Sequence, residues 1–198
     1  VAQRVYRWTD RGWQIAYAMN VVGRHFAVAD FGTPGATPAD FDRTQLDGVA
    51  EVVVTGQSPP PSLSAISLVT LGGQVVFRKT LDGIGGPPVI ADVDGDGYPE
   101  IGVSGSNTYR VFDLKAAGAA DPYVKWSKPI ADSSSSSAGS AGFDFDGDGA
   151  MEIVSADQCF TRIFSGSTGA VVFSAPRWSC TWSEYPVVAD TNGDGLAE

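Results

Sequence analysis

Residues 88–104 read Pro88-Val-Ile-Ala-Asp-Val-Asp-Gly-Asp-Gly-Tyr-Pro-Glu-Ile-Gly-Val-Ser104, a short apolar strand, a carboxylate-rich loop and a second apolar strand. The loop places Asp92, Asp94 and Asp96 at positions 1, 3 and 5, a glycine at position 6 and Glu100 at position 9. Carboxylates two residues apart in a tight turn converge on one point, and glycines permit the backbone angles of such a turn. Because like charges this close repel unless a cation neutralises them, the stretch predicts a hard-cation site, for which Ca²⁺ fits the oxygen ligands best.

The same pattern recurs twice in intact form. Residues 142–154 read Gly142-Phe-Asp-Phe-Asp-Gly-Asp-Gly-Ala-Met-Glu-Ile-Val154, and residues 187–198 read Val187-Val-Ala-Asp-Thr-Asn-Gly-Asp-Gly-Leu-Ala-Glu198. In the register of the first loop, the side-chain ligands are Asp144, Asp146, Asp148 and Glu152 in one copy and Asp190, Asn192, Asp194 and Glu198 in the other. Three intact loops therefore predict about three bound calcium ions per chain.

A fourth copy is broken by an insertion. Phe26-Ala-Val-Ala-Asp30 supplies the strand and the first aspartate, and Asp47-Gly-Val-Ala-Glu51 supplies the end of the loop. A degenerate metal site at Asp30, Asp47 and Glu51 requires the insert to fold outward, with Asp40 or Asp42 as the middle ligand, because a long insert makes loop closure costly. Counted at the loop-terminal glutamates, the four copies are 49, 52 and 46 residues apart, and this period indicates a solenoid, propeller or array.

The composition is typical of an all-β protein. In a chain of 198 residues, 24 glycines and 12 prolines separate short segments rich in β-branched and aromatic residues. The formal net charge is −10, but the three intact loops hold 11 of the 23 acidic residues, which leaves 12 acids against 13 bases. The charge therefore favours bound cations and argues against a nucleic-acid partner. No run of residues approaches the roughly 20 apolar positions of a membrane span.

Each repeat contains four short strands, with the carboxylate loop between the first and the second. In the copy around Asp92 the expected strands are residues 89–91, 101–104, 108–114 and 123–129. Four-stranded antiparallel units at this period predict a β-propeller, either one domain over residues 1–198 or a fragment that further blades or a second copy would complete. The repeat units are approximately residues 1–51, 52–100, 101–152 and 153–198. Trp8, Trp13 and Trp126 follow strand patterns and are expected in the core between blades.

An EF-hand is the nearest alternative for an Asp-x-Asp-x-Asp-Gly loop. Its twelfth position should be a bidentate glutamate, whereas position 12 is Val103 in one copy and Ser155 in the next. Its flanks should be helices, and the flanks in this chain are rich in valine and isoleucine. The loops are therefore expected to be strand hairpins closed by the glutamate at position 9.

The pattern Val-x-Ala-Asp-x-Asp-Gly-Asp-Gly-x-x-Glu-Ile-x-Val resembles the FG-GAP or VCBS repeat, the calcium-binding blade unit of the integrin α-subunit propeller and of many bacterial secreted proteins. The resemblance covers nearly the whole chain through its four copies. It implies side-chain ligands at the acidic and asparagine positions given above. It also implies a backbone ligand at the seventh position of each intact loop, namely the carbonyl groups of Tyr98, Ala150 and Leu196.

Strand alternation places the second-to-third connection of each unit, and the connections between units, at the edge opposite the carboxylate loops. Cys159 begins a third strand and Cys180 follows a fourth, so both fall at this opposite edge. A Cys159–Cys180 disulfide is compatible with that placement and with an oxidising compartment, and two unrelated thiols are the alternative. The same edge gathers Trp178, Trp182 and Tyr185, which either bind a sugar or a protein partner or pack beneath a long loop.

Each loop supplies a nearly complete ligand set, which leaves little room for metal catalysis and favours a structural role for the ions. The chain has a single histidine, His25, no Ser-His-Asp arrangement and no glycine-rich phosphate loop, so we expect no enzymatic activity. The leading hypothesis is a secreted or cell-surface adhesion module, lectin-like or protein-binding, that uses the face opposite the calcium loops. The alternatives are a propeller domain of an extracellular polysaccharide-degrading enzyme and a structural repeat of a surface appendage.

Overall fold

A computed structural model describes residues 3–19, 21–56, 64–115, 123–179, 184–193 and 197. Within these ranges the chain is all-β, with fourteen strands and one short 3₁₀ helix, η1 (Pro38–Asp40). None of the described segments forms a helix that is long and apolar enough to span a membrane. The all-β prediction is therefore confirmed for the described part of the chain.

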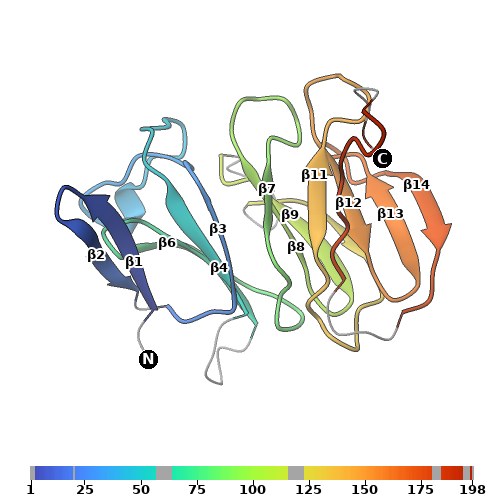
Figure 1. Ribbon diagram of the computed structural model, residues 1–198, viewed down its shortest axis with the longest axis horizontal. Coiled ribbons are helices and arrows are strands. Elements are labelled where there is room, and N and C mark those ends of the chain that lie inside the picture. The colour runs from blue at the N-terminus through green and yellow to red at the C-terminus, as the bar shows by residue number, and fades with distance from the viewer. Residues whose placement is uncertain are drawn as a thin grey trace.

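Twelve of the strands form three four-stranded antiparallel sheets, in each of which the strands pair in sequence order (Figure 1). The first sheet contains β3 (His25–Ala29), β4 (Glu51–Thr55), β5 (Ala65–Val69) and β6 (Val75–Thr80). The second contains β7 (Val89–Ala91), β8 (Glu100–Ser104), β9 (Thr108–Phe112) and β10 (Val124–Pro129). The third contains β11 (Ser140–Phe143), β12 (Glu152–Ala156), β13 (Phe160–Phe164) and β14 (Val171–Pro176). The remaining two strands, β1 (Gln3–Thr9) and β2 (Gly12–Met19), form a separate hairpin.

The second strand of each sheet is buried along its whole length. β4, β8 and β12 begin with the loop-terminal glutamate and continue with valine, isoleucine and small residues, and every residue in them is buried. A run that is apolar on both faces is typical of a strand covered on both sides. Each of these strands is therefore a rigid base on which its carboxylate loop is mounted.

The three sheets stand side by side, with β7 contacting β3 on one side and β11 on the other (Figure 1). Between the first two sheets, Phe77 and Phe112 meet edge to face with ring centroids 5.5 Å apart. Between the second and third, Phe164 packs against Trp126 and Tyr109 at centroid distances of 5.7 and 6.1 Å. Aromatic side chains thus bury the faces that neighbouring sheets share.

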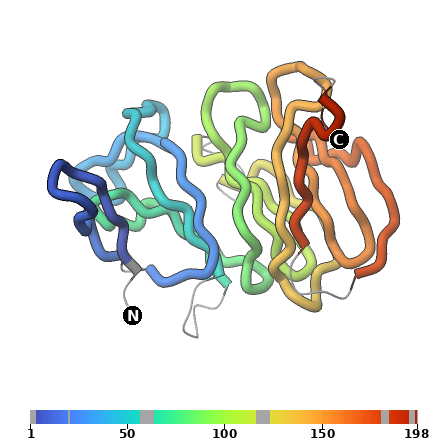
Figure 2. Tube along the Cα trace, in the orientation of Figure 1, coloured from blue at the N-terminus to red at the C-terminus, as the bar shows by residue number. Residues whose placement is uncertain are grey.

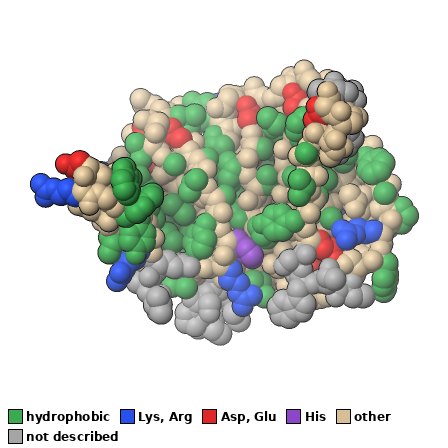
Figure 3. Space-filling view, in the orientation of Figure 1, with side chains coloured by type: hydrophobic (Ala, Val, Ile, Leu, Met, Phe, Trp, Pro, Cys, Tyr) green, Lys and Arg blue, Asp and Glu red, His purple; other side chains and the backbone are tan. Residues whose placement is uncertain are grey.

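The carboxylate loops lie at one edge of this row of sheets. Figure 2 shows the connections β3–β4, β7–β8 and β11–β12 at the same end of the molecule, at the top of the view. Because strands alternate in direction, the connection between the third and fourth strands of each sheet reaches that edge as well. This edge, which we call the loop edge, is where the predicted ligands gather, and acidic side chains are visible along it in Figure 3.

The propeller prediction is confirmed only in its coarser form. The described residues give successive four-stranded antiparallel sheets, but they do not close into a barrel or a ring. Each sheet takes its first strand from one predicted repeat unit and its other three from the next, because the loop-terminal glutamate opens the second strand. After the third sheet, the backbone amide of Gly139, just before β11, donates to the carbonyl of Glu184, so the chain returns alongside that sheet.

The expected positions of the tryptophans are only partly correct. Trp126 is buried between sheets and donates its ring N–H to the carbonyl of Gly166 at 2.5 Å. Trp8 and Trp13 are instead 65% and 69% exposed, and they pack against each other across the β1–β2 hairpin with centroids 5.3 Å apart. The other face of this hairpin, with Met19, packs against the first sheet, so no described element covers the tryptophan face.

Candidate metal centre

Each carboxylate loop is the turn of a hairpin between the first two strands of its sheet. Asp92 follows β7 directly, and Glu100 opens β8, where it pairs in register with Ala91. In the third sheet, Glu152 pairs with Phe143 in the same way. The expectation that these loops are strand hairpins, and not EF-hands, is therefore confirmed.

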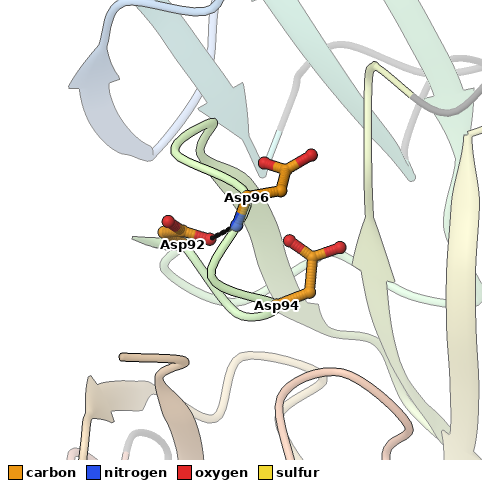
Figure 4. A group of neighbouring side chains, drawn as sticks. All are labelled: Asp92, Asp94 and Asp96. Atoms are coloured by element: carbon orange, nitrogen blue, oxygen red, sulfur yellow. Dashed lines mark hydrogen bonds between the residues drawn. The ribbon is translucent and has the colours of Figure 1, made fainter. Parts of the chain in front are cut away.

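The aspartate at position 1 organises the loop backbone. Both carboxylate oxygens of Asp92 accept hydrogen bonds, from the amides of Gly95 at 2.8 Å, Asp96 at 3.1 Å and Gly97 at 2.8 Å. Gly95 and Gly97 have φ angles of 73° and 84°, which side chains with a Cβ adopt only with strain. Figure 4 shows the result: Asp92, Asp94 and Asp96 lie on one turn, and the amide of Asp96 points to Asp92.

The loop of the third sheet repeats this geometry closely. Asp144 accepts from the amides of Gly147 at 2.7 Å, Asp148 at 3.2 Å and Gly149 at 3.0 Å. Gly147 and Gly149 again have positive φ angles, of 76° and 92°. Two loops 52 residues apart thus reach the same conformation through the same backbone donors.

The glutamate at position 9 is buried beneath the loop. Glu100 is 1% exposed, and its Oε2 accepts from the amide of Val93 at 2.8 Å, while its Oε1 has no hydrogen-bond partner. Burial, reinforced by the nearby charges of Asp94 and Asp113, raises the pKa of Glu100 to about 8, although the Val93 amide opposes the shift. Burial likewise raises the pKa of Glu152, whose Oε2 accepts from an amide in its own loop.

Three groups of acidic side chains bring ligand atoms within 4.8 Å of one another in the described residues. They are Asp92, Asp94 and Asp96; Asp94, Glu100 and Asp113; and Asp144, Asp146 and Glu152. The sequence reasoning identified every member except Asp113, which lies at the loop edge because it directly follows β9, the third strand of the second sheet. Asp113 could have been predicted from the alternation of strand directions, because the third strand of each sheet ends at the loop edge.

The broken copy in the first sheet closes like the intact loops. The amide of Gly48 donates to Oδ2 of Asp30 at 2.5 Å, as Gly97 does to Asp92, and the amide of Phe31 donates to Oε2 of Glu51 at 2.9 Å. Glu51 is fully buried with Oε1 unpartnered, and burial followed by the charges of Asp30 and Asp47 raises its pKa to about 7. The loop is therefore closed between Asp30 and Glu51, but Asp30, Asp47 and Glu51 are not one of the groups of described residues whose ligand atoms lie within 4.8 Å of one another, and a metal site there stays a prediction.

The proposed middle ligands of that copy are engaged elsewhere. Asp40 accepts from the backbone amide and the hydroxyl of Thr37 at 3.1 and 2.8 Å. Asp42 accepts from the amide and the hydroxyl of Thr44 at 2.9 and 2.7 Å. Neither joins an acidic group of the described residues that could hold a metal ion.

Half of the last loop lies within the described residues. The amide of Gly193 donates to Oδ1 of Asp190 at 2.5 Å, and Gly193 has a φ of 80°, so this half starts as the other loops do. Asn192 belongs to the described part, whereas Asp194, Leu196 and Glu198 lie outside it. The carbonyl ligands expected at Tyr98 and Ala150 remain predictions, with both residues in the loops as expected.

The residues predicted at the opposite edge are found there as far as the structure describes them. Cys159 lies in the β12–β13 turn, and its carbonyl accepts from the amide of Arg177 at 2.7 Å. Trp178 is 83% exposed, and Tyr185 is exposed beside Gly139. Cys180 and Trp182 lie outside the described residues, so the Cys159–Cys180 disulfide stays a prediction.

The donor set fits a hard divalent cation. Oδ1 of Asp94 and Oε1 of Glu100 are buried oxygens without a hydrogen-bond partner, and an unpaired buried acceptor is costly unless something binds it. Carboxylate oxygens alone, with no histidine or thiol among them, suit Ca²⁺ or Mg²⁺ better than a transition metal. Burial and crowding of like charges therefore make a cation the natural completion of these loops.

A family model and a solved structure are each similar to part of this chain. Residues 92–155 match the model of the FG-GAP-like repeat family. The crystal structure of the V. cholerae biofilm matrix protein Bap1 aligns with a TM-score of 0.45 and 21% identity, over 68% of this chain and 27% of that chain, so this chain spans little more than a quarter of that protein's length. No curated protein matches the sequence. The family match includes the loops at Asp92 and Asp144, so the part of the chain that is similar to the FG-GAP-like repeat contains two of the three intact loops.

Proposed function

We propose that this chain is a calcium-stabilised, non-catalytic binding module that acts outside the cell. The observation that carries the proposal is the pair of buried, unpartnered carboxylate oxygens of Asp94 and Glu100, which a cation would satisfy. The ligands would be the acidic and asparagine side chains of the three intact loops, and about three ions would bind per chain. The ion supplies charge neutralisation, and the loop residues supply a preformed cradle mounted on buried strands.

An extracellular location is supported by the physical requirements of such loops. Each ion would hold a hairpin turn and contribute about 1 to 3 kcal/mol to stability at extracellular calcium levels. Loops of this kind would stay largely empty in a calcium-poor cytosol, where the crowded carboxylates would destabilise the fold. A thermal melt in about 1 mM Ca²⁺ and again in excess chelator, together with a metal count on the native protein, tests the proposal. No shift and no bound ion would overturn it.

The surface we propose for ligand binding is the edge opposite the loops. Trp178 and Tyr185 expose aromatic rings there, and such rings recognise sugars or anchor a protein partner. Because the loops would be filled by structural ions, we propose no catalytic role for the metal. Screening glycans, polysaccharides and extracellular proteins for binding, and the polysaccharides also for cleavage, distinguishes a binding module from a polysaccharide-degrading enzyme. Cleavage would favour the enzyme.

We further propose that the row of sheets continues into a β-propeller. In the second sheet, Ile90 is half-buried against the core of the first sheet. The position equivalent to Ile90 in the first sheet is Val28, one residue before the strand end, and it is 64% exposed. The β1–β2 hairpin packs on the Val52 and Val54 part of the equivalent face of the first sheet, while Val28 beside it is open. Further strands of the same repeat that extend this hairpin into a four-stranded sheet would cover Val28. Native mass measurements, with Val28→Lys as the interface variant, test whether a second copy supplies that sheet.

A further inference from the structure

In the second sheet a lysine from the last strand contacts the carboxylate loop, whereas the described residues give the loop of the third sheet no such contact. The ammonium group of Lys125 on β10 contacts Oδ2 of Asp94 and lies 3.3 Å from Oδ2 of Asp113. Its side chain is only 15% exposed, so this contact is poorly screened by solvent. A second lysine, Lys115, lies 3.0 Å from Oδ2 of Asp96 at the rim of the loop. A protein cation therefore already occupies part of the acidic cluster.

A β-bulge directs Lys125 toward the loop. In the β9–β10 pairing, Val124 faces Phe112 and Trp126 faces Val111, so Lys125 is the extra, unpaired residue. A bulge residue departs from the alternation of the strand, which re-aims its side chain. The end of β10 at the loop edge is thereby turned onto the carboxylates.

The third sheet has the same bulge with a different residue. In the β13–β14 pairing, Phe164 faces Val171 and Ile163 faces Phe173, so the extra residue is Val172. The residue that corresponds to Asp113 is a serine, Ser165, which follows β13 directly. Lys125 and Asp113 of the second sheet thus correspond to Val172 and Ser165 of the third.

Val172 faces a space beside the third-sheet loop that is equivalent to the space Lys125 fills beside the second-sheet loop. A pocket of about 390 Å³ beside the third-sheet loop is lined by Asp146, Asp148, Glu152, Ser165 and Val172. The acidic residues of this loop form no ion pair with a lysine or arginine in the described part of the chain. The space beside the bulge residue is therefore open at the third-sheet loop, whereas the Lys125 ammonium group fills the equivalent space at the second-sheet loop.

We propose that the bulge residue of the last strand sets how tightly each carboxylate loop binds a divalent cation, and that Lys125 makes the Asp92–Glu100 loop the weaker calcium site of the two. The inference rests on the proposed calcium binding and specifies its regulation by the protein's own residues. A divalent ion at Asp94 has to displace the Lys125 ammonium or tolerate its repulsion, and both lower the affinity. In the third-sheet loop no such competitor is present at the bulge.

The second loop nevertheless keeps the means to bind metal. Lys125 reaches Asp94 and Asp113, whereas Oε1 of Glu100, in a side chain that is 1% exposed, stays unpartnered within the same group of ligand atoms. The ammonium group thus leaves a buried acceptor that a calcium ion would satisfy. The lysine stabilises the loop when calcium is scarce, and the ion binds when calcium is abundant.

The test measures Ca²⁺ binding by calorimetry in two backgrounds, each of which retains one of the two loops. The first background leaves the second-sheet loop, and in it Lys125→Met is compared with Lys128→Met, a lysine on the same strand that serves as the control. The second background leaves the third-sheet loop, and in it Val172→Lys introduces the charge at the equivalent bulge. The first background carries Asp146→Asn, Asp148→Asn and Asp190→Asn, which remove charged ligands from the third-sheet loop and the last loop. The second background carries Asp94→Asn, Asp96→Asn and Asp190→Asn, which remove them from the second-sheet loop and the last loop.

We expect Lys125→Met to tighten Ca²⁺ binding about tenfold and Val172→Lys to weaken it about tenfold, with Lys128→Met unchanged. In excess chelator, Lys125→Met should also melt at a lower temperature than Lys128→Met, because its carboxylates lose their counter-ion. Equal calcium affinities of the Lys125→Met and Lys128→Met proteins would overturn the inference and leave the proposed function standing. Absence of calcium binding by the unmodified protein would overturn both.

Discussion

The amide of Val93 donates to one carboxylate oxygen of Glu100 at 2.8 Å, while the other oxygen of Glu100 is buried without a partner. One half of the carboxylate therefore fastens the loop to its strand, and the other half faces the acidic cluster. The same division is found at Glu51, whose Oε2 accepts from Phe31 and whose Oε1 is unpartnered. The loop-terminal glutamate is thus placed to link the hairpin to the cation that we propose.

Replacing Glu100 with glutamine should have opposite effects with and without calcium. In excess chelator we expect Glu100→Gln to melt at a higher temperature than the unmodified protein, because an ionised carboxylate at this buried site is costly. In calcium we expect the opposite order, with Ca²⁺ binding at this loop weakened at least about tenfold by the loss of a charged ligand. Asp10→Asn, in the exposed β1–β2 turn, is the control. An unchanged calcium-induced shift for Glu100→Gln would contradict a ligand role.

Asp82 should make stability depend on pH in the acid range. Its carboxylate accepts from the amide of Asn107 at 2.8 Å, the hydroxyl of Thr108 at 2.5 Å and Arg110 at 3.1 Å. Burial acts to raise the pKa of Asp82, but these hydrogen bonds and the arginine hold it below the ordinary value of 3.8. A lowered pKa means that the unfolded chain binds the proton more readily, so this stabilisation is present above pH 3.8 and is lost as the pH falls further.

We therefore expect Asp82→Asn to cost about 1 to 3 kcal/mol near pH 6, with a shrinking difference from the unmodified protein below pH 3.8. Urea unfolding at a series of pH values measures this difference. The exposed Asp10→Asn protein should follow the unmodified protein throughout. A difference that stays constant down to pH 3 would show that Asp82 acts through packing instead of charge.

Phe164 should be a principal support of the contact between the second and third sheets. It is fully buried and packs against Trp126 and Tyr109, so Phe164→Ala leaves a cavity and should cost about 3 to 5 kcal/mol in urea unfolding. Phe173, a half-exposed residue of β14 in the same sheet, should cost less than about 1 kcal/mol when replaced by alanine. Similar losses for both variants would mean that the two sheets are not held together by this aromatic cluster.

Ser104 should contribute a hydrogen bond between neighbouring sheets. Its hydroxyl, at the end of β8, donates to the carbonyl of Ala138 at 2.5 Å in a fully buried position. Thr55 occupies the same position in the first sheet and donates to Gly86 at 2.7 Å, so the contact recurs. We expect Ser104→Ala to cost about 1 to 2 kcal/mol by chemical unfolding, because the buried carbonyl loses its donor. Ser127→Ala on exposed strand surface should be neutral, and an equal loss there would discount the hydrogen bond.

Local sequence predicted most of the strands. In the repeat around Asp92, the strand at Val89–Ala91 has the expected bounds, and the other three differ by one or two residues at one end. The reason is that alternation, β-branched residues and glycine-rich turns act within short segments. The tryptophans of the β1–β2 hairpin were harder to place, because a strand pattern gives the face of a side chain and does not show whether a neighbouring sheet covers that face.

The sequence alone determined the strand, loop and strand of the repeats at Asp92 and Asp144 and the candidate ligands within them, because these residues lie within nine consecutive positions and glycine fixes the turn between them. Only the tertiary structure decided that Asp113 and Lys125 join the loop at Asp92. These residues come from later strands, and their approach depends on strand pairing and on a bulge that turns Lys125 inward. Local chemistry therefore sets which cation a loop suits, and the packing of distant strands sets what competes for it.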